Sequence, residues 1–496
     1  MTTESAASQR SRAQLARKAI PRSELGVFTP VDRDPVALIK EQDKGRVKAL
    51  VPLRHERMSA SLFTFYRGTA GLMAHDLAQQ AQTDTHLVIC GDAHLNNFGL
   101  YASPERRLVF DLNDFDEAAP GPWEWDVKRL LTSAIVAAEE IDATPEEVDE
   151  IVLAGAKAYR TYLDQALSLP ALERHYMSLD STQLAHSVRE DAVKQFDKTT
   201  KKAQRRDSDR AIAKMMQPDR MGFMRFKEEP PILTHDSLRS DVDFDALFAQ
   251  YFASALPDIS YLLSRFTMTD VAFRVVGVGS VGTRCHVIAL TGPENSGIIL
   301  QTKEARQSVV TQYSTPNVTT PATLRPGMED GERVVTHQRI LQAVSDAFLG
   351  HLKDGKLSFY VRQFRDSKGS FDTRSMNVGS LTDYVALCAS ILARAHSQSS
   401  LAHWVSGYIG DSTVFDQAML SWCRAYQEQT KSDYAAYLAA YQAGKLTGED
   451  SSSLGGKFSV KQRWDRTGAD DSPEEHRSQH RRAHHHSRHR ERTVDP

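Results

Sequence analysis

The sequence lacks the features that define several common protein classes. Its four cysteines, Cys90, Cys285, Cys388 and Cys423, stand far apart and form no CxxC pair, so we expect neither a disulfide framework nor a zinc site. No apolar run approaches the ~20 residues that cross a bilayer, and the N-terminus has no apolar signal-peptide core. We therefore expect a cytoplasmic protein without a membrane partner.

A large excess of charge of one sign is also missing. The 496 residues include 61 Lys and Arg against 64 Asp and Glu, a formal net charge of −3, which argues against a general polyanion binder. One dense basic run, residues 194–214, could contact nucleic acid. Its interspersed aspartates and sparse aromatics instead favour a solvated helix face or a mobile insertion. Nucleic acid is not expected as a partner, and nothing in the sequence indicates the oligomeric state.

The composition is that of an ordinary globular protein, with 41% hydrophobic and 25% charged residues. The length fits two or three domains, or one large two-lobed one. The two ends differ from the rest: residues 1–21 are polar and basic, and residues 444–496 are Ser/Gly-rich, then charged and rich in His and Arg. We expect a flexible N-terminal segment and a disordered C-terminal tail.

Two apolar strands lead into an unusual group of polar side chains. The first strand, 87–90, breaks at Gly91, and the loop that follows carries Asp92, His94, Asn96 and Asn97. The second strand, 108–112, runs into four carboxylates: Asp111, Asp114, Asp116 and Glu117.

Carboxylates at the ends of buried strands repel one another and lose hydration. A divalent cation would offset both costs, and oxygen ligands of this kind suit Mg²⁺. The alternative is a capped turn in which Asn and Asp side chains bond their own backbone.

Three arginines, Arg54, Arg57 and Arg67, lie beside a loop rich in aromatic residues, 63–68. Guanidinium groups bind phosphate or carboxylate through paired hydrogen bonds. The same arginines could equally be surface residues that pair with nearby acidic side chains.

A glycine loop, 277–282, lies between the expected strands 270–276 and 283–290, and a third strand follows at 297–303. A dinucleotide-binding fold would need a helix after the glycines. The β-branched segment that follows instead fits a glycine-rich hairpin over nucleotide phosphates, with Lys303 on the third strand. The alternative is a plain glycine-rich hairpin with an edge lysine.

The remaining elements are expected to be mainly helical. A linker-like zone covers 218–231 and a further strand covers 357–364. The expected helices are 35–43, 71–82, 123–138, 144–167, 244–266, 329–349 and 381–398, with further helix to 443.

The motifs resemble the protein-kinase-like fold, in its aminoglycoside-phosphotransferase branch. Residues 91–97, GDAHLNN, resemble that branch's HGDxHxxN catalytic loop, with Cys90 in place of the histidine. Asp114-Phe115-Asp116 resembles the metal-binding motif, 277–282 the glycine loop, and Lys303 the phosphate-anchoring lysine.

The resemblance assigns roles to individual residues. Asp92 would orient or deprotonate the acceptor hydroxyl, and Asn97 would bind Mg²⁺. Asp126 follows twelve residues after Asp114, a spacing similar to that in these enzymes, so Asp114 is the preferred metal ligand, with Asp111 and Asp116 as alternatives. The nucleotide would contact Gly277, Gly279, Ser280, Gly282 and Lys303, with Glu332 as the partner of the lysine. The acceptor would contact Arg54, Arg57, Arg67 and His94.

The order of the motifs indicates a circular permutation, because the glycine loop and lysine follow the catalytic loop instead of preceding it. We expect an α+β, two-lobed, circularly permuted protein-kinase-like fold. Residues 22–265 and 365–443 would form a mostly helical large lobe, and 266–364 a small antiparallel β lobe.

More specifically, the chain resembles a bacterial family known as domain of unknown function 2252. The phrases that carry this resemblance are LVPLRHERM, FTFYRG, GDAHLNNFG, FDLNDFDEAAPGPWEWDVKRL, RVVGVGSVGTRC and FYVRQFRDSKGS. The family label supplies no substrate. The kinase resemblance implies an ATP- and Mg²⁺-dependent phosphotransferase acting on an unknown small-molecule or protein hydroxyl. The alternatives are a nucleotidyl (AMP) transferase on the same fold and a non-catalytic ATP-binding pseudokinase.

Overall fold

The structure is a computed structural model that describes residues 4–179, 199–201, 208–221, 224–235, 243–293, 296–315, 327–364 and 369–446. Nearly all of the expected disordered tail lies outside these residues, as do large parts of the basic run 194–214 and of the loop after Tyr313.

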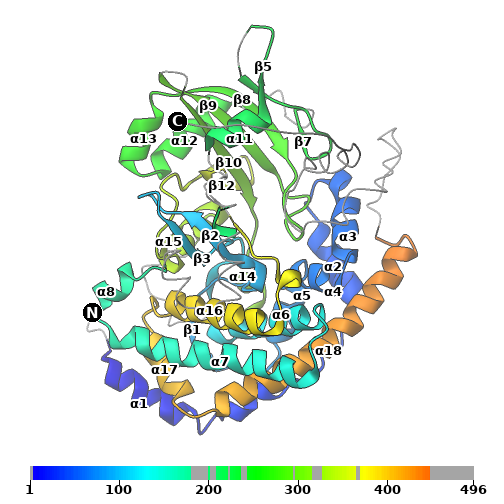
Figure 1. The fold of residues 1–496 in the computed structure, drawn as a ribbon, viewed down its shortest axis with the longest axis vertical. Helices are drawn as coiled ribbons and strands as arrows, with labels where there is room; N and C mark the ends of the chain where they lie inside the picture. The colour runs from blue at the N-terminus through cyan, green and yellow to red at the C-terminus, as the bar shows by residue number, and fades with distance from the viewer. Residues whose placement is uncertain are drawn as a thin grey trace, which may run out of the picture. The chain divides into compact units, whose positions relative to one another are not determined.

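The described residues form a mixed α+β fold, as expected, with antiparallel sheets (Figure 1). The helices of the first half are α1 (Ala6–Ala16), α2 (Pro35–Asp43), α3 (Val51–Ser59), α4 (Leu62–Arg67), α5 (Ala70–Leu77), α6 (Trp123–Glu139), α7 (Pro145–Ser168) and α8 (Ala171–Tyr176). Those of the second half are α11 (Ser208–Met215), α12 (Phe244–Ser254), α13 (Pro257–Leu263), α14 (Val309–Tyr313), α15 (Asp330–Leu341), α16 (Val378–His396), α17 (Ala402–Ile409) and α18 (Val414–Gln442). Short 3₁₀ turns are η1 (Arg22–Gly26), η2 (Lys48–Leu50), η3 (Leu95–Asn97) and η5 (Thr373–Ser375).

The largest sheet has six antiparallel strands in the order β11-β12-β10-β9-β8-β7. Its strands are β7 (Leu233–Thr234), β8 (Thr267–Arg274), β9 (Cys285–Thr291), β10 (Gly297–Ala305), β11 (Gly350–Asp354) and β12 (Leu357–Gln363). Three two-stranded pairs are β1 (His86–Ile89) with β4 (Ala119–Pro122), β2 (Phe98–Ala102) with β3 (Leu108–Leu112), and β5 (Met216–Pro218) with β6 (Met224–Phe226).

Alternation along the strands explains why the large sheet is covered on both faces. On β9, Val287 and Ala289 belong to a core cluster with α11 and β6, whereas Ile288 and Leu290 belong to a cluster with α12 and α13. Side chains with a period of two point to opposite faces, so a strand with apolar residues at every position is buried from both sides. The helices α12 and α13 lie beside this sheet in Figure 1.

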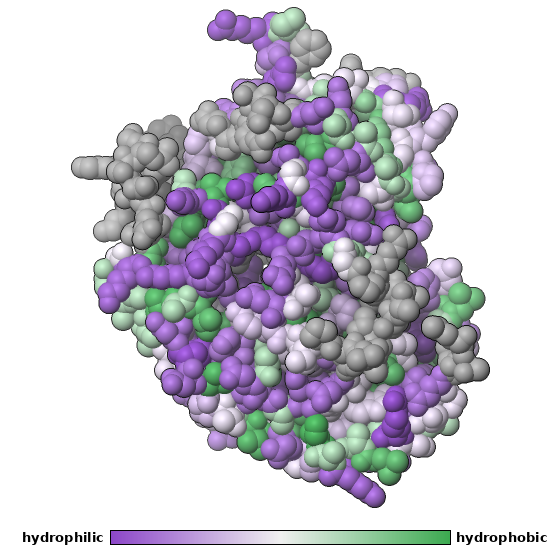
Figure 2. All heavy atoms as spheres, turned by 180° about the vertical axis from the view of Figure 1, so that it is seen from behind, coloured by the Kyte–Doolittle hydropathy of each residue, from purple (hydrophilic) through white to green (hydrophobic). Residues whose placement is uncertain are grey.

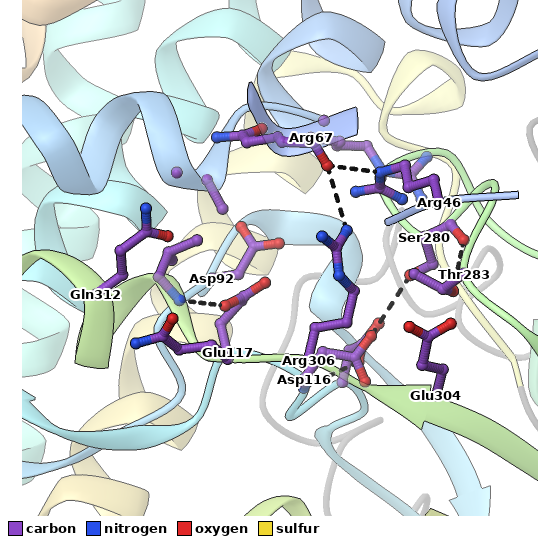
Figure 3. A pocket seen from close by; sticks show the side chains of 18 of the residues that line it. Arg46, Arg67, Asp92, Asp116, Glu117, Ser280, Thr283, Glu304, Arg306 and Gln312 are labelled. Carbon is purple, nitrogen blue, oxygen red and sulfur yellow. Dashed lines mark hydrogen bonds between the residues drawn. The ribbon is translucent and has the colours of Figure 1, made fainter. Parts of the chain in front are cut away.

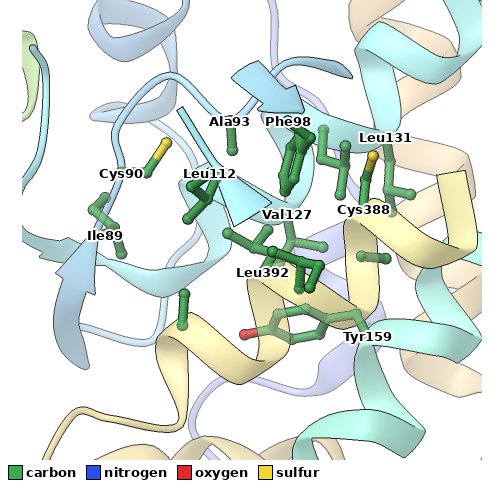
Figure 4. Packing of buried hydrophobic residues seen from close by; sticks show 14 of the residues in the cluster. Ile89, Cys90, Ala93, Phe98, Leu112, Val127, Leu131, Tyr159, Cys388 and Leu392 are labelled. Atoms are coloured by element: carbon green, nitrogen blue, oxygen red, sulfur yellow. The ribbon is translucent and has the colours of Figure 1, made fainter. Parts of the chain in front are cut away.

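The main core lies among the long helices α6, α7 and α16, which pack against the strand pairs β1–β4 and β2–β3 (Figure 4). Every residue of α6 except the last is buried, so this helix is a core helix and not a surface one. Helix α7 begins as its sequence predicts, with Thr144 and Glu147 forming a capping box and Pro145 in the first turn. Because α16 is distant in sequence from α6 and α7, the core unites the two ends of the chain.

The structure corrects four sequence expectations. The expected flexible segment 1–21 contains α1, whose Ala13 is buried beside α17. The aromatic loop 63–68 is instead helix α4, which begins at a capping box between Ser61 and Thr64. The linker-like zone 218–231 contains the strand β6. The helix expected over 329–349 ends at Leu341, and β11 begins soon afterwards.

One described helix, α16, is long and apolar enough to cross a membrane by length and composition, which the sequence analysis did not expect. Most of its residues are buried against α7 and α6, as in the core helix of a soluble protein. On the face drawn in Figure 2, hydrophobic residues form small scattered areas.

Candidate functional site

A lysine and two aspartates from distant parts of the chain meet beside the large sheet. Lys303, on β10, is 3% exposed and forms an ion pair with the Asp116 carboxylate, 187 residues away in sequence. Its Nζ lies 3.7 Å from Oδ2 of Asp114. Burial lowers the pKa of Lys303, but the attraction of Asp114 and Asp116 more than offsets this and raises the pKa well above its usual value.

Asp116 is the more firmly held of the two aspartates. Its Oδ1 accepts a hydrogen bond from the Tyr360 hydroxyl at 2.9 Å, and its Oδ2 lies 3.5 Å from Oγ of Ser280 in the glycine loop. Asp114 has the more exposed side chain, at 38% against 24%. Asp114 is therefore the more accessible carboxylate for a ligand.

The loop after β1 is fixed from behind by the first turn of α6. Asp126, fully buried, accepts hydrogen bonds from the backbone N–H groups of Cys90 at 2.7 Å and Gly91 at 2.8 Å. Its Oδ2 also lies 3.2 Å from Nε2 of His396, at the end of α16. Gly91 has a φ of 77°, and a Cβ there would meet the Glu117 carbonyl oxygen at 2.4 Å, so only glycine fits.

Asp92 follows this anchored turn. Its Oδ1 accepts a hydrogen bond from Nε of Arg129 at 2.8 Å. Burial raises the pKa of Asp92 even though Arg129 opposes the shift. The Asn97 amide nitrogen donates to the Asp92 carbonyl oxygen, so the amide oxygen of Asn97 is the atom left to bind a cation.

Asp92, Asn97, Asp114, Asp116 and Ser280 line a cleft of about 310 Å³, drawn in Figure 3, whereas Lys303 is not among its lining residues. The acidic side is formed by Asp92, Asp114, Asp116 and Glu117 together with Asn97. The other lining residues include Glu41, Gln42, Lys44, Arg46, Arg67, Gly68, Ala70, Gly71, Gly279, Ser280, Thr283, Glu304, Arg306, Gln307, Val309, Gln312 and Tyr313.

The turn after α2 and the helix α3, both earlier in the chain than β1, hold the glycine loop in place. The Gly282 carbonyl oxygen accepts a hydrogen bond from the Val47 N–H at 2.7 Å, and the Val281 carbonyl oxygen accepts one from Arg46 at 2.7 Å. Arg57 donates to the Gly277 carbonyl oxygen. Gly277 and Gly282 have φ values of 72° and 88°, in the region that glycine occupies most readily.

Several sequence candidates lie elsewhere. Both carboxylate oxygens of Asp111 accept backbone N–H bonds, from Leu112 and Ala343, each at 2.8 Å, and Asp111 is not among the residues that line the cleft. Glu332 does not pair with Lys303 in the described structure, and its charge acts on His351 of β11.

The three candidate arginines lie in different surroundings. Arg54 is fully buried and bonded to Asp43 and the Gly68 carbonyl oxygen, whereas Arg67 lines the cleft. His94 is buried, with Nε2 3.7 Å from the Asp92 carboxylate. Burial and the charges of Arg67 and Arg129 lower the pKa of His94 well below its usual value.

The sequence analysis missed Gln42, Arg46, Glu117 as a cleft residue, Arg129 and Arg306. Arg46 lies in a stretch of mixed charge, 40–48, that is typical of a solvated surface, and Arg129 follows an apolar helical period in which an arginine is ordinary. The one local signal was the unusual density of charge on the first turns of α6, at Glu124, Asp126, Lys128 and Arg129, all of which are buried.

Among the described residues, no group of three or more His, Cys, Asp or Glu side chains is arranged to hold a metal ion. The residues of the cleft nevertheless fit Mg²⁺. This ion commonly binds one or two carboxylates and completes its coordination shell with water and substrate phosphates. Asp114 and the amide oxygen of Asn97 line the same cleft and supply such oxygen ligands.

Comparison with known families identifies the chain. Residues 46–440 match the family described as "Uncharacterized protein conserved in bacteria (DUF2252)", and the chain belongs to this family. No curated protein and no solved structure matches it.

Proposed function

We propose that this protein is an ATP- and Mg²⁺-dependent phosphotransferase built on a circularly permuted protein-kinase-like fold. The observation that carries the proposal is the ion pair of Lys303 with Asp116 and its approach to Asp114. Through it, the second strand after the glycine loop contacts the acidic loop, whose Asp114 and Asp116 line the same cleft as Asp92. Phosphoryl transfer needs this combination, because its catalysis is mostly positioning and charge neutralisation.

Each residue has a role in this proposal. Lys303 and the backbone of Gly279 and Ser280 hold the nucleotide phosphates, and Asp92 orients the acceptor hydroxyl and takes its proton. Asp114 and Asn97 would hold Mg²⁺, which neutralises phosphate charge when bound. Because ATP is abundant inside cells, this function implies a cytoplasmic protein.

The replacement of the motif histidine by Cys90 does not weaken the proposal. The Cys90 side chain is buried in the core, while its N–H is bonded to Asp126. His396, from α16, contacts the same carboxylate. The anchoring of the loop is therefore supplied by the backbone and by a histidine that comes from another part of the chain.

The first test is the melting-temperature shift caused by Mg²⁺·ATP. Ligand at about 100 times its Kd stabilises the native state by ~2.7 kcal/mol, so the wild type should show a clear, magnesium-dependent shift. Lys303→Met and Asp114→Ala should abolish it. Lys353→Met, which removes a half-exposed lysine of β11, is the matched control and should keep it. Absence of a shift in the wild type would refute nucleotide binding.

The reaction products separate the proposal from its alternatives. Release of ADP with a phosphorylated acceptor indicates a kinase, whereas release of pyrophosphate with an AMP adduct indicates a nucleotidyl transferase. A protein that binds Mg²⁺·ATP but yields neither would be a pseudokinase. The presence of Asp92 in the cleft favours a catalytic function.

A further inference from the structure

Two buried hydrogen-bond donors in the cleft have no partner. Nε of Arg67 and Nε2 of Gln42 are both shielded from solvent and make no hydrogen bond to any described residue, and both side chains line the cleft. A buried donor without an acceptor costs roughly 1–3 kcal/mol. Such groups are expected where a ligand supplies the missing acceptor.

Two further arginines that line the cleft, Arg46 and Arg306, lie close together. Arg46 and Arg306 both donate to the Gln42 carbonyl oxygen, at 3.1 and 3.2 Å, and the nearest carboxylate to Arg46, that of Asp43, lies 3.8 Å from its Nε. In Figure 3, dashed lines from Arg46 and Arg306 meet at one oxygen atom. Burial, then repulsion by Arg54 and Arg306, lowers the pKa of Arg46 to about 9. An anion would relieve this repulsion.

Helix α5 begins at the same place. Ala70 and Gly71, its first two residues, line the cleft. No side chain caps this end, because the Thr69 hydroxyl donates to the carbonyl oxygens of Phe65 and Tyr66 instead. The uncapped N–H groups and the helix dipole favour an anion, as at other helix N-termini.

The electrostatic surroundings distinguish Arg67 from Lys303, whereas Arg46 also bonds the glycine loop. The carboxylates that act on Arg67 are Asp92 and Asp114, whereas those that act on Lys303 are Asp114 and Asp116. Arg67 therefore lies on the same side of Asp114 as Asp92, where a hydroxyl acceptor must approach. Lys303 lies on the side of Asp116.

We propose that Arg67 and Gln42, backed by Arg46, Arg306 and the start of α5, form an anion subsite for the acceptor. The acceptor is then a hydroxyl compound that also carries an oxyanion, either a phosphate or a carboxylate. This inference rests on the proposed phosphotransferase function for the identity of the ligand, but the anion subsite itself does not depend on it. The planar guanidinium edge of Arg67 and the amide of Gln42 supply the directed hydrogen bonds.

The test is calorimetric titration of the full chain with inorganic phosphate, and separately with acetate, with and without saturating Mg²⁺ and a non-hydrolysable ATP analogue. Phosphate or acetate should bind whether or not the analogue is present, and the tighter of the two identifies the anion. Arg67→Gln and Gln42→Leu should each weaken binding by roughly tenfold or more. Arg12→Gln, an exposed arginine of α1, is the charge-matched control and should bind as the wild type does.

Gln42→Leu keeps the test valid if Arg67→Gln folds poorly. Removing an unpartnered buried donor should leave the free energy of unfolding unchanged or raise it, so a loss of anion binding without a loss of stability cannot come from misfolding. A merely structural glutamine would show the opposite pattern.

Three results would overturn the proposal. The first is the absence of anion binding in the wild type. The second is displacement of the anion by the ATP analogue, which would make this the nucleotide-phosphate site. The third is equal weakening in Arg12→Gln. If the protein binds an anion through Arg67 but binds no nucleotide, the anion subsite stands and its role for an acceptor is refuted. The two proposals can therefore fail separately.

Discussion

Asp92 is subject to two opposing effects, since burial favours its neutral form and the guanidinium of Arg129 favours its charged form. A carboxylate in such a balance is suited to accept a proton. We expect Asp92→Asn to lower turnover by at least about 100-fold while the Mg²⁺·ATP melting shift persists. The measurement is ADP release alongside the melting shift.

The control for Asp92→Asn is the melting temperature without ligand, because the change leaves the Arg129 guanidinium without its carboxylate and should cost roughly 1–3 kcal/mol. The assay should therefore be run well below the variant's melting temperature. Undiminished turnover would refute the role of Asp92 as the proton acceptor.

His337 gives a prediction on acid stability. It is 3% exposed on α15, with Nδ1 2.7 Å from the Arg333 carbonyl oxygen, and burial is the main cause that lowers its pKa from 6.5 to about 4. Between these two values the folded protein binds fewer protons than the unfolded chain, so stability falls as the pH drops through this window.

We expect the wild type to lose roughly 2–3 kcal/mol more than His337→Gln between pH 7 and pH 4. The measurement is urea unfolding at a series of pH values. His175→Gln changes an exposed histidine of α8 and serves as the control. Parallel pH profiles of the wild type and His337→Gln would contradict the prediction.

Single residues of the site differ in how far the sequence could reveal them. Asp92, Asn97 and Asp114 stand close together in the chain, so the sequence could single them out together, and all three line the cleft. Gln42 and Arg306 become cleft residues only because α2 lies against the end of β10, a contact across 264 residues. No local pattern encodes such a contact, so their role could not be predicted.

At the scale of elements, the start of α5 provides a test of the anion subsite by shape instead of charge. A Cβ at Gly71 would lie 2.0 Å from Nε2 of Gln42, so Gly71→Ala should push this flexible amide aside. Alanine favours a helix over glycine by up to about 1 kcal/mol, so stability should hold while phosphate binding weakens.

The double variant Gly71→Ala with Gln42→Leu serves as the control, measured by calorimetry and urea unfolding. If the alanine acts through the amide, the double variant should bind phosphate as Gln42→Leu alone does. Additive losses would show that Gly71→Ala disturbs the cleft in another way.

Helices and strands that are determined by neighbouring residues were predicted well. Those that depend on tertiary contacts were not. The capping box at Thr144 and the apolar segment of β9 can be recognised from residues that are close together in the sequence. By contrast, β6 is only three residues long and is stabilised by pairing with β5 and by burial against β8. Its proline-containing surroundings resemble a linker until these partners are known.

At the scale of the whole molecule, distant parts of the chain contribute to one core, while the lobe boundaries that the order of motifs suggested stay a prediction. Helices α7 and α16 pack against each other, and His396 reaches Asp126 across 270 residues. The sequence could not predict that residues 41–71 would line one part of the cleft. Their contacts with the glycine loop are hydrogen bonds to its backbone carbonyl oxygens, which any residue type supplies.

A buried ion-pair network extends the folded unit beyond the part of the chain that matches the family. Arg33 precedes the matched residues 46–440, yet its guanidinium bonds both Asp76 of α5, at 2.6 and 2.7 Å, and Asp433 of α18, at 2.7 Å. All three side chains are at most 5% exposed. Removing one partner of a buried ion pair leaves the remaining charge buried and uncompensated.

We therefore expect Arg33→Met to lower the free energy of unfolding by about 3–5 kcal/mol, measured by urea unfolding. Arg10→Met breaks an ion pair with Asp164 whose side chains are 38% and 53% exposed, so this control should cost only about 0–1 kcal/mol. The Mg²⁺·ATP shift should survive in Arg33→Met because Arg33 does not line the cleft. Equal losses in the two variants would contradict the prediction, whereas the expected difference would show that residues before the family match are needed to join α5 to α18.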